Sequence, residues 1–158
     1  FYNHKNTGRP LQNGKWFEKF RSNYLDVDND ALYPFGYGLS YTTFQYGDIV
    51  LNTPTMKQNE TITATIQVTN SGKYDGAEVV QLYIRDLVGS ITRPVRELKG
   101  FKKIFLKAGE SKTVSFKITA DLLRFYDYDL NQVTEPGEFD IFIGGSSQAT
   151  KTARLTLK

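Results

Sequence analysis

Apolar and polar residues alternate at every second position along four stretches of the chain. The stretches are 60–69, 111–119, 137–144 and 152–158. Successive side chains of a β-strand point to opposite faces, so this period predicts four strands that each have one buried and one solvent-exposed face. Ile66 and Phe116 lie on the apolar faces of the first two stretches. Both are therefore predicted to be core residues.

Three weaker patterns predict further strands, at 44–51, at 77–86 and within 95–106. Glycine, proline and asparagine separate these segments at short intervals, as expected for turns. Strands that are apolar on one side must pair those sides, and two stacked sheets do so. No helical period alternates with the strands. The sequence therefore predicts an all-β fold, a fibronectin-III-like (immunoglobulin-like) β-sandwich of about seven strands.

Residues 1–43 show neither the helical period nor the strand period of two over any long window, and they carry turn residues throughout. Only 15–25 has the spacing of a short helix. Twelve of the twenty-two aromatic residues lie within 1–46. We interpret 1–43 as an extended, aromatic-rich strap from the end of a preceding domain, and 44–158 as the sandwich. Residues 39–46 are expected to pack on the sandwich as the lead-in to its first strand. The predicted domain-docking side chains of this arm are Tyr33, Phe35, Tyr37, Leu39, Tyr41 and Phe44.

The composition excludes several kinds of chemistry. The 158 residues include no cysteine and one histidine, His4. Disulfide scaffolds, cysteine-ligated metals and thiol catalysis are therefore ruled out, and we expect no metal and no cofactor. The run 26–30, DVDND, begins like a calcium loop, but Ala31 and Tyr37 occupy the positions where that loop needs glycine and glutamate. No apolar run approaches the ~20 residues of a membrane helix, so no membrane partner is expected.

Basic residues are concentrated in 93–107, where six lysines and arginines accompany one acidic residue, Glu97. A net charge of +3 does not by itself indicate nucleic-acid binding. Phe101 and Phe105 could stack on bases, but they also fit core positions of a strand. Because lysines commonly protect the edges of sheets, we interpret the stretch as a solvated sheet edge and expect no nucleic-acid partner.

Two pairs of carboxylates could in principle serve a glycosidase, which needs two such groups across the scissile bond. Asp127 and Asp129 are predicted to point to the same side of a strand, and Glu135 and Glu138 form the second pair. Nothing around either pair indicates a substrate cleft. No catalytic residue is therefore assigned.

Residues 32–44, LYPFGYGLSYTTF, resemble the hallmark that closes the second catalytic-region domain of family 3 glycoside hydrolases and leads into their C-terminal fibronectin-III-like domain. The resemblance covers nearly the whole chain. Its other segments are 1–10, 68–72, 76–83, 93–94, 97–101, 106–110, 135–137 and 142–144.

The resemblance implies a role without chemistry of its own. The family cleaves β-glycosidic bonds with retention, using carboxylates that lie upstream of this part. Its Ser-Asp-Trp nucleophile motif is absent here, because the single tryptophan, Trp16, follows Lys15. The chain is thus identified as a non-catalytic C-terminal accessory domain of a periplasmic or secreted β-glucosidase, inactive alone. Its partners would be the N-terminal catalytic domains of the same parent, whose substrate would be an oligosaccharide or glycoside.

Two other functions remain open at this point. A carbohydrate-binding module would need exposed, coplanar rings on the sandwich itself. An independent adhesion domain would use the arm for dimerisation.

Overall fold

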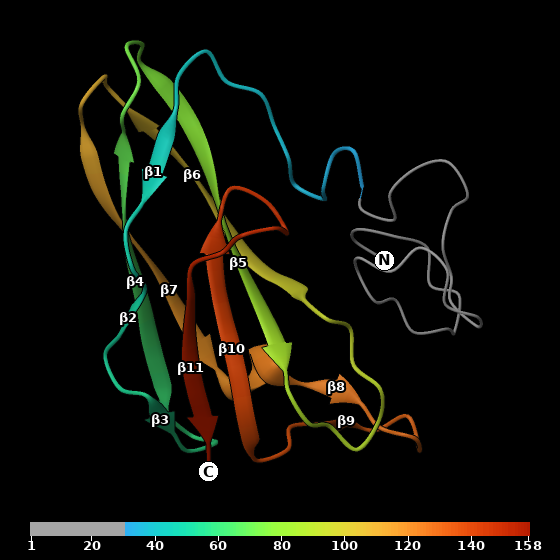
Figure 1. The fold of residues 1–158 in the computed structure, drawn as a ribbon. Coiled ribbons are helices and arrows are strands. Elements are labelled where there is room, and N and C mark those ends of the chain that lie inside the picture. The colour runs from blue at the N-terminus through green and yellow to red at the C-terminus, as the bar shows by residue number, and fades with distance from the viewer. Residues whose placement is uncertain (1–30) are drawn as a thin grey trace, which may run out of the picture.

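The computed structural model describes residues 31–158, whose two large β-sheets pack face to face (Figure 1). The predicted helix at 15–25, the acidic run at 26–30 and His4 lie outside the described residues. No helix in 31–158 is long and apolar enough to cross a membrane.

Each sheet is built around long antiparallel strands. The first contains β1 (Phe44–Tyr46), β2 (Val50–Leu51), β4 (Thr61–Asn70) and β7 (Ser111–Thr119). The second has the order β3 (Thr55–Met56), β11 (Thr152–Leu157), β10 (Gly137–Gly144), β5 (Gly76–Asp86) and β6 (Glu97–Leu106). All seven predicted strand segments are present, so the predicted all-β sandwich is confirmed.

The predicted strand at 44–51 is divided into β1 and β2, which pair with the same strand, β4. The backbone N–H of Gly47 still donates to the Gln67 carbonyl oxygen at 2.9 Å, so the intervening residues stay beside β4. The chain then crosses to the second sheet, where β3 pairs in parallel with β11. Residues 44–56 therefore join both sheets.

The core lies between the sheets, as the alternation predicts. Ile66 and Phe116 are 1% and 6% exposed, so both predictions of burial are confirmed. They belong to one cluster that takes residues from both sheets, including Val80, Ile141 and Leu155. Burying such side chains stabilises the fold by about 25 cal/mol per Å² of apolar surface.

Three phenylalanines lie on the outer face of the second sheet. Phe101 and Phe105 do not enter the core and are 67% and 55% exposed, because Ile104 and Leu106 take the inward positions of β6. Phe142 points away from the core but is buried under the Arg96 guanidinium, 3.9 Å from its ring centroid.

The segment between β7 and β10 contains elements that are too short for a periodic pattern. A 3-10 helix at Ala120–Leu123 is followed by a small hairpin of β8 (Phe125–Tyr126) and β9 (Gln132–Val133). The Arg93 guanidinium lies over the Phe125 ring, 4.4 Å from its centroid. This contact fixes the hairpin against the loop before β6.

Candidate functional site

The arm leaves the top of β1 and runs along the side of the molecule on which β5 and β6 lie (Figure 1). It turns at Pro34, whose carbonyl oxygen accepts a hydrogen bond from the Tyr37 N–H at 3.0 Å. Gly36 has φ +78°, a conformation that favours glycine. The Ser147 N–H donates to the Phe35 carbonyl oxygen at 2.8 Å. The turn is therefore attached to the loop between β10 and β11.

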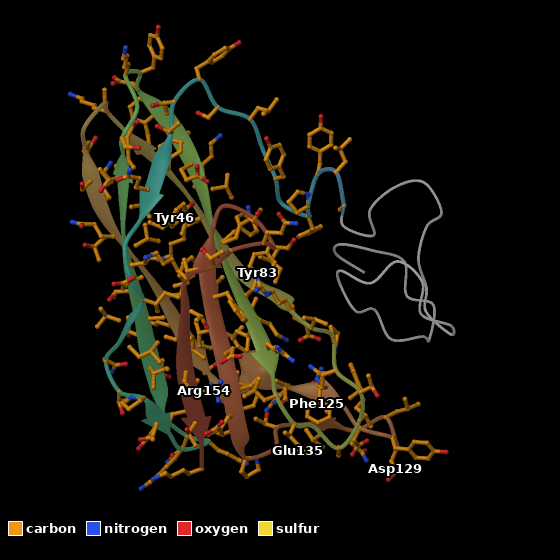
Figure 2. The ribbon with its side chains drawn as sticks, in the orientation of Figure 1. Tyr46, Tyr83, Phe125, Asp129, Glu135 and Arg154 are labelled. Carbon is orange, nitrogen blue, oxygen red and sulfur yellow. The ribbon has the colours of Figure 1, made fainter. Side chains whose placement is uncertain are left out.

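A buried glutamine on β5, Gln81, fixes the same turn. Its amide nitrogen Nε2 donates to the carbonyl oxygens of Gly36 at 3.0 Å and Gly145 at 2.7 Å. Its Oε1 accepts a hydrogen bond from the buried Tyr83 hydroxyl at 2.5 Å. A Cβ on Gly36 would lie 2.0 Å from that Oε1, so no other residue fits here without displacing the anchor. Figure 2 shows Tyr83 on the side of the sandwich that the arm passes.

The six predicted docking side chains divide into two groups. Tyr33, Phe35, Tyr37, Leu39 and Tyr41 are exposed, whereas Phe44 packs against the core. The prediction that 39–46 packs on the sandwich is therefore wrong for its first part, since Leu39 and Tyr41 are 88% and 97% exposed. The reason is that the arm is held through backbone groups and the buried Thr42, and burial of its large side chains is not needed to hold it in place.

An open groove of about 350 Å³ lies between the arm and β5. Tyr37 and Leu39 line it from the arm, Ala77 and Val79 from β5, and Ser146 from the loop between β10 and β11. The apolar side chains in this lining continue the exposed side chains of the arm. The groove therefore connects the arm to the outer face of the second sheet.

Glu78 also lines the groove and is close to the Tyr46 hydroxyl, which points into the interior of the sandwich (Figure 2). Burial raises the pKa of the Glu78 carboxyl, against the opposing effects of Tyr46 and of the Val79 N–H. Burial, and secondly the Glu78 charge, raises the pKa of the Tyr46 hydroxyl. That hydroxyl is buried without a hydrogen bond of ordinary geometry among residues 31–158.

The raised pKa of Glu78 predicts a pH-dependent effect on stability. The native state holds this proton more tightly than the unfolded state, so the stabilisation is complete below the unfolded pKa of about 4.3 and is lost as the pH rises. Glu78→Gln should therefore gain stability relative to the unmodified chain between about pH 4 and pH 7. Urea denaturation of both proteins across this range measures the difference. A difference that stays constant with pH would contradict the prediction.

The structure does not bring the predicted carboxylate pairs together as acid and base. Asp127 begins the hairpin loop, not a strand, and its Oδ1 accepts hydrogen bonds from the N–H groups of Asp129 and Asn131, both at 2.9 Å. Asp129 lies out on that loop (Figure 2). The prediction of a shared strand face is therefore wrong, because the side chain of Asp127 forms the turn.

Glu135 and Glu138 each have a structural partner. The Glu135 carboxylate accepts a hydrogen bond from the Ser90 N–H at 3.0 Å. Glu138 forms an ion pair with Arg154 across β10 and β11. Among residues 31–158 no three histidine or acidic side chains are grouped so that they could hold a metal ion.

The basic stretch 93–107 includes β6, which lies at the edge of the second sheet, as predicted. Its two arginines both have structural partners. Arg93 donates two hydrogen bonds of 3.1 Å to Glu97, and Arg96 donates to the carbonyl oxygens of Ser147 and Ala149. The anchoring role of Gln81 was not predicted, since a single polar residue within a strand carries no local signal of a distant partner.

Two sheets around a single apolar core define this chain as a fibronectin type III-like β-sandwich. The family profile described as "Fibronectin type III-like domain" matches residues 78–147.

Relatives with longer chains then specify the family. The chain is 48% identical to the periplasmic beta-glucosidase of Salmonella typhimurium over 157 residues, which are 99% of this chain and 20% of that protein. It is 49% identical to a beta-xylosidase of Formosa agariphila over 87% of this chain and 19% of the relative. The Listeria innocua beta-glucosidase in complex with isofagomine superposes with a TM-score of 0.88 and 39% identity, over 99% of this chain and 22% of that structure. The resemblance to the C-terminal part of family 3 glycoside hydrolases is thereby confirmed, and the chain spans about a fifth of the length of these relatives.

Proposed function

We propose that the chain is a non-catalytic accessory domain of a β-glycosidase that hydrolyses β-glycosidic bonds with retention, and that its arm docks the sandwich onto the catalytic domains of the same parent. The division at 1–43 and 44–158, the glycoside substrate of that parent and a periplasmic or secreted location belong to this proposal. The similarity to a periplasmic beta-glucosidase and a beta-xylosidase supports it.

The observation that carries the proposal is the way the arm is held. Hydrogen bonds from Gln81 and Ser147 fix its backbone, while five large apolar side chains face solvent. Contiguous exposed apolar surface of several hundred Å² marks interaction sites in soluble proteins. A rigid backbone that displays such side chains loses little conformational entropy on docking. The arm therefore has the properties of a preformed contact surface.

A chimeric enzyme tests the role of the arm. In it, this chain replaces the matching 157 residues of the Salmonella typhimurium beta-glucosidase. We expect the chimera to hydrolyse aryl β-glucosides and to unfold in one thermal transition. Tyr37→Asp with Leu39→Asp should separate the unfolding of the sandwich from that of the catalytic domains, because the charges remove the apolar contact.

The matched control changes exposed aromatic residues away from the arm, Tyr126→Thr with Tyr128→Thr, and should keep the single transition. The isolated 158-residue chain with the arm substitutions should unfold like the unmodified chain, since Tyr37 and Leu39 are exposed. A single transition in the arm variant would refute the docking role.

Carbohydrate binding remains the second candidate because two rings of the sandwich itself, Phe101 and Phe105, are exposed on one face of β6. Titration of the isolated chain with soluble cello- and xylo-oligosaccharides measures it directly. Saturable binding that Phe101→Thr abolishes would favour this function.

A further inference from the structure

We propose that the docking surface extends beyond the arm, across the groove and onto the outer face of β5 and β6, and that it receives a protein surface of the catalytic domains that is apolar at its centre and acidic at its rim. This inference rests on the proposed function and deepens it by naming the second half of the contact and the chemistry of its partner.

The pairing of β5 with β6 establishes that the surface is continuous. Phe105 lies opposite Ala77, Lys103 opposite Val79 and Phe101 opposite Gln81. Opposite residues of an antiparallel pair have Cβ atoms ~5 Å apart on the same face of the sheet.

The arm then borders the β5 side of this row. Ala77 and Val79 line the groove together with Tyr37 and Leu39, and Gln81 holds the arm backbone at Gly36. Arm, groove and β6 therefore form one surface, whose large exposed apolar side chains include Tyr37, Leu39, Val79, Phe101 and Phe105.

The exposure of two phenylalanine rings distinguishes this face from an ordinary strand surface. Phe101 and Phe105 are 67% and 55% exposed on an edge strand, although two exposed phenylalanines promote association unless a partner covers them. Their neighbours Ile104 and Leu106 take the inward positions of the same strand, so the core does not need these rings. Their exposure is therefore a feature of the outer face.

The charges around the rings indicate the chemistry of the partner. Lys103 lies between the two rings on the outer face and makes no ion pair within residues 31–158. Of the neighbouring lysines, Lys99 is paired with Glu97 and Lys102 lies over the Phe116 ring, so Lys103 supplies the unpaired charge beside the two rings. Complementary potentials steer and orient association, so carboxylates are expected opposite Lys103. Aromatic centres with a charged rim are typical of protein interfaces.

The chimera described above tests this inference separately from the arm. Phe101→Thr with Phe105→Thr removes both rings and keeps β-branched residues in the strand. We expect this variant to lose the single thermal transition, as the arm variant does, while the Tyr126→Thr with Tyr128→Thr control keeps it. The isolated 158-residue chain that carries the Phe101 and Phe105 changes should unfold at the same midpoint as the unmodified chain, which shows that the sandwich itself is intact.

Reversing the charge of Lys103 tests whether the partner surface has an acidic rim. Lys103→Glu in the chimera should lower the midpoint at low ionic strength more than Lys103→Gln does, and about 0.5 M salt should reduce the difference, because salt screens exposed charges. Equal effects of the two substitutions would overturn the acidic rim.

The remaining outcomes separate the two proposals. The arm variant could separate the two transitions while the Phe101 and Phe105 variant keeps a single one. That result would contradict the extended surface and would still support docking through the arm. If neither variant separates the transitions, or if the unmodified chimera already unfolds in two steps, both proposals fail. Saturable oligosaccharide binding that depends on Phe101, with a single transition in its variant, would assign the face to sugar and overturn the protein contact.

Discussion

Phe116→Ala is expected to destabilise the sandwich by about 3–5 kcal/mol, the usual cost of truncating a core phenylalanine. The ring is 6% exposed and belongs to the central cluster between the sheets. It also covers the backbone of Gly100, since a Cβ on that residue would lie 3.6 Å from the Phe116 Cδ1. Alanine would leave a cavity that strands of both sheets border. Urea denaturation of the isolated 158-residue chain measures the change in the free energy of unfolding.

Phe101→Ala provides the matched control, because it removes the same side chain from the solvent-exposed face of β6. Surface substitutions usually change stability by less than about 0.5 kcal/mol. A similar loss for both variants would show that the assignment of inner and outer faces is wrong.

Asn70→Asp is expected to have the second large effect, a loss of about 3 kcal/mol or more at neutral pH. Asn70 is completely buried. Its Oδ1 accepts hydrogen bonds from the Thr42 hydroxyl at 2.6 Å and the Gly72 N–H at 3.1 Å. Its Nδ2 donates to the carbonyl oxygens of Tyr74 at 2.8 Å and Leu106 at 3.2 Å. An aspartate would retain the two accepted bonds but would direct a charged oxygen at two carbonyl oxygens.

Part of this loss should be recovered in acid. A protonated carboxyl can donate to one of the two carbonyl oxygens, so the folded state would raise the pKa of the new side chain. Stability relative to the unmodified chain should therefore improve as the pH falls toward about 4. Asn52→Asp is the control, because Asn52 is exposed and uses its Oδ1 only to accept a bond from the Thr63 N–H, which an aspartate also provides. An Asn70→Asp variant as stable as this control would contradict the role of the amide donors.

The fold could be predicted because its long strands follow one rule over many residues. In β4, buried and more exposed positions alternate from Ile62 to Asn70, and β7 pairs with it in register from Thr61 opposite Thr119 onward. The hydrophobic effect acts on such a pattern regardless of which strand becomes the neighbour. One-sided strands of this length therefore predict two stacked sheets.

The inner and outer faces of β6 could not be predicted in this way. The run from Phe101 to Leu106 holds apolar residues on both faces, so either face could have been buried. The pairing of β5 with β6 also shifts register between Leu82 and Tyr83. The sequence therefore left open whether Phe101 and Phe105 are core residues, and the structure places both on the exposed face.

The candidate site was only partly predictable for a related reason. The aromatic content of the arm indicated a contact surface, but its anchor depends on Gln81, which lies 45 residues beyond Gly36 in the sequence. Phe142 likewise gains its cover from Arg96 on another segment. Contacts between distant segments leave no periodic signal, so they emerge only from the fold.

The parallel pairing of β3 with β11 has a mechanical consequence. The Thr156 N–H donates to the Pro54 carbonyl oxygen and the Lys158 N–H to the Met56 carbonyl oxygen, both at 2.9 Å. Tension applied between the arm and the C-terminal strand would pull these two segments past each other along their length. Both hydrogen bonds would then be loaded at the same time in shear, whereas an antiparallel hairpin pulled from its open end loses its bonds one after another. The parallel pairing of β3 with β11 should therefore resist stretching forces that reach the sandwich through its arm.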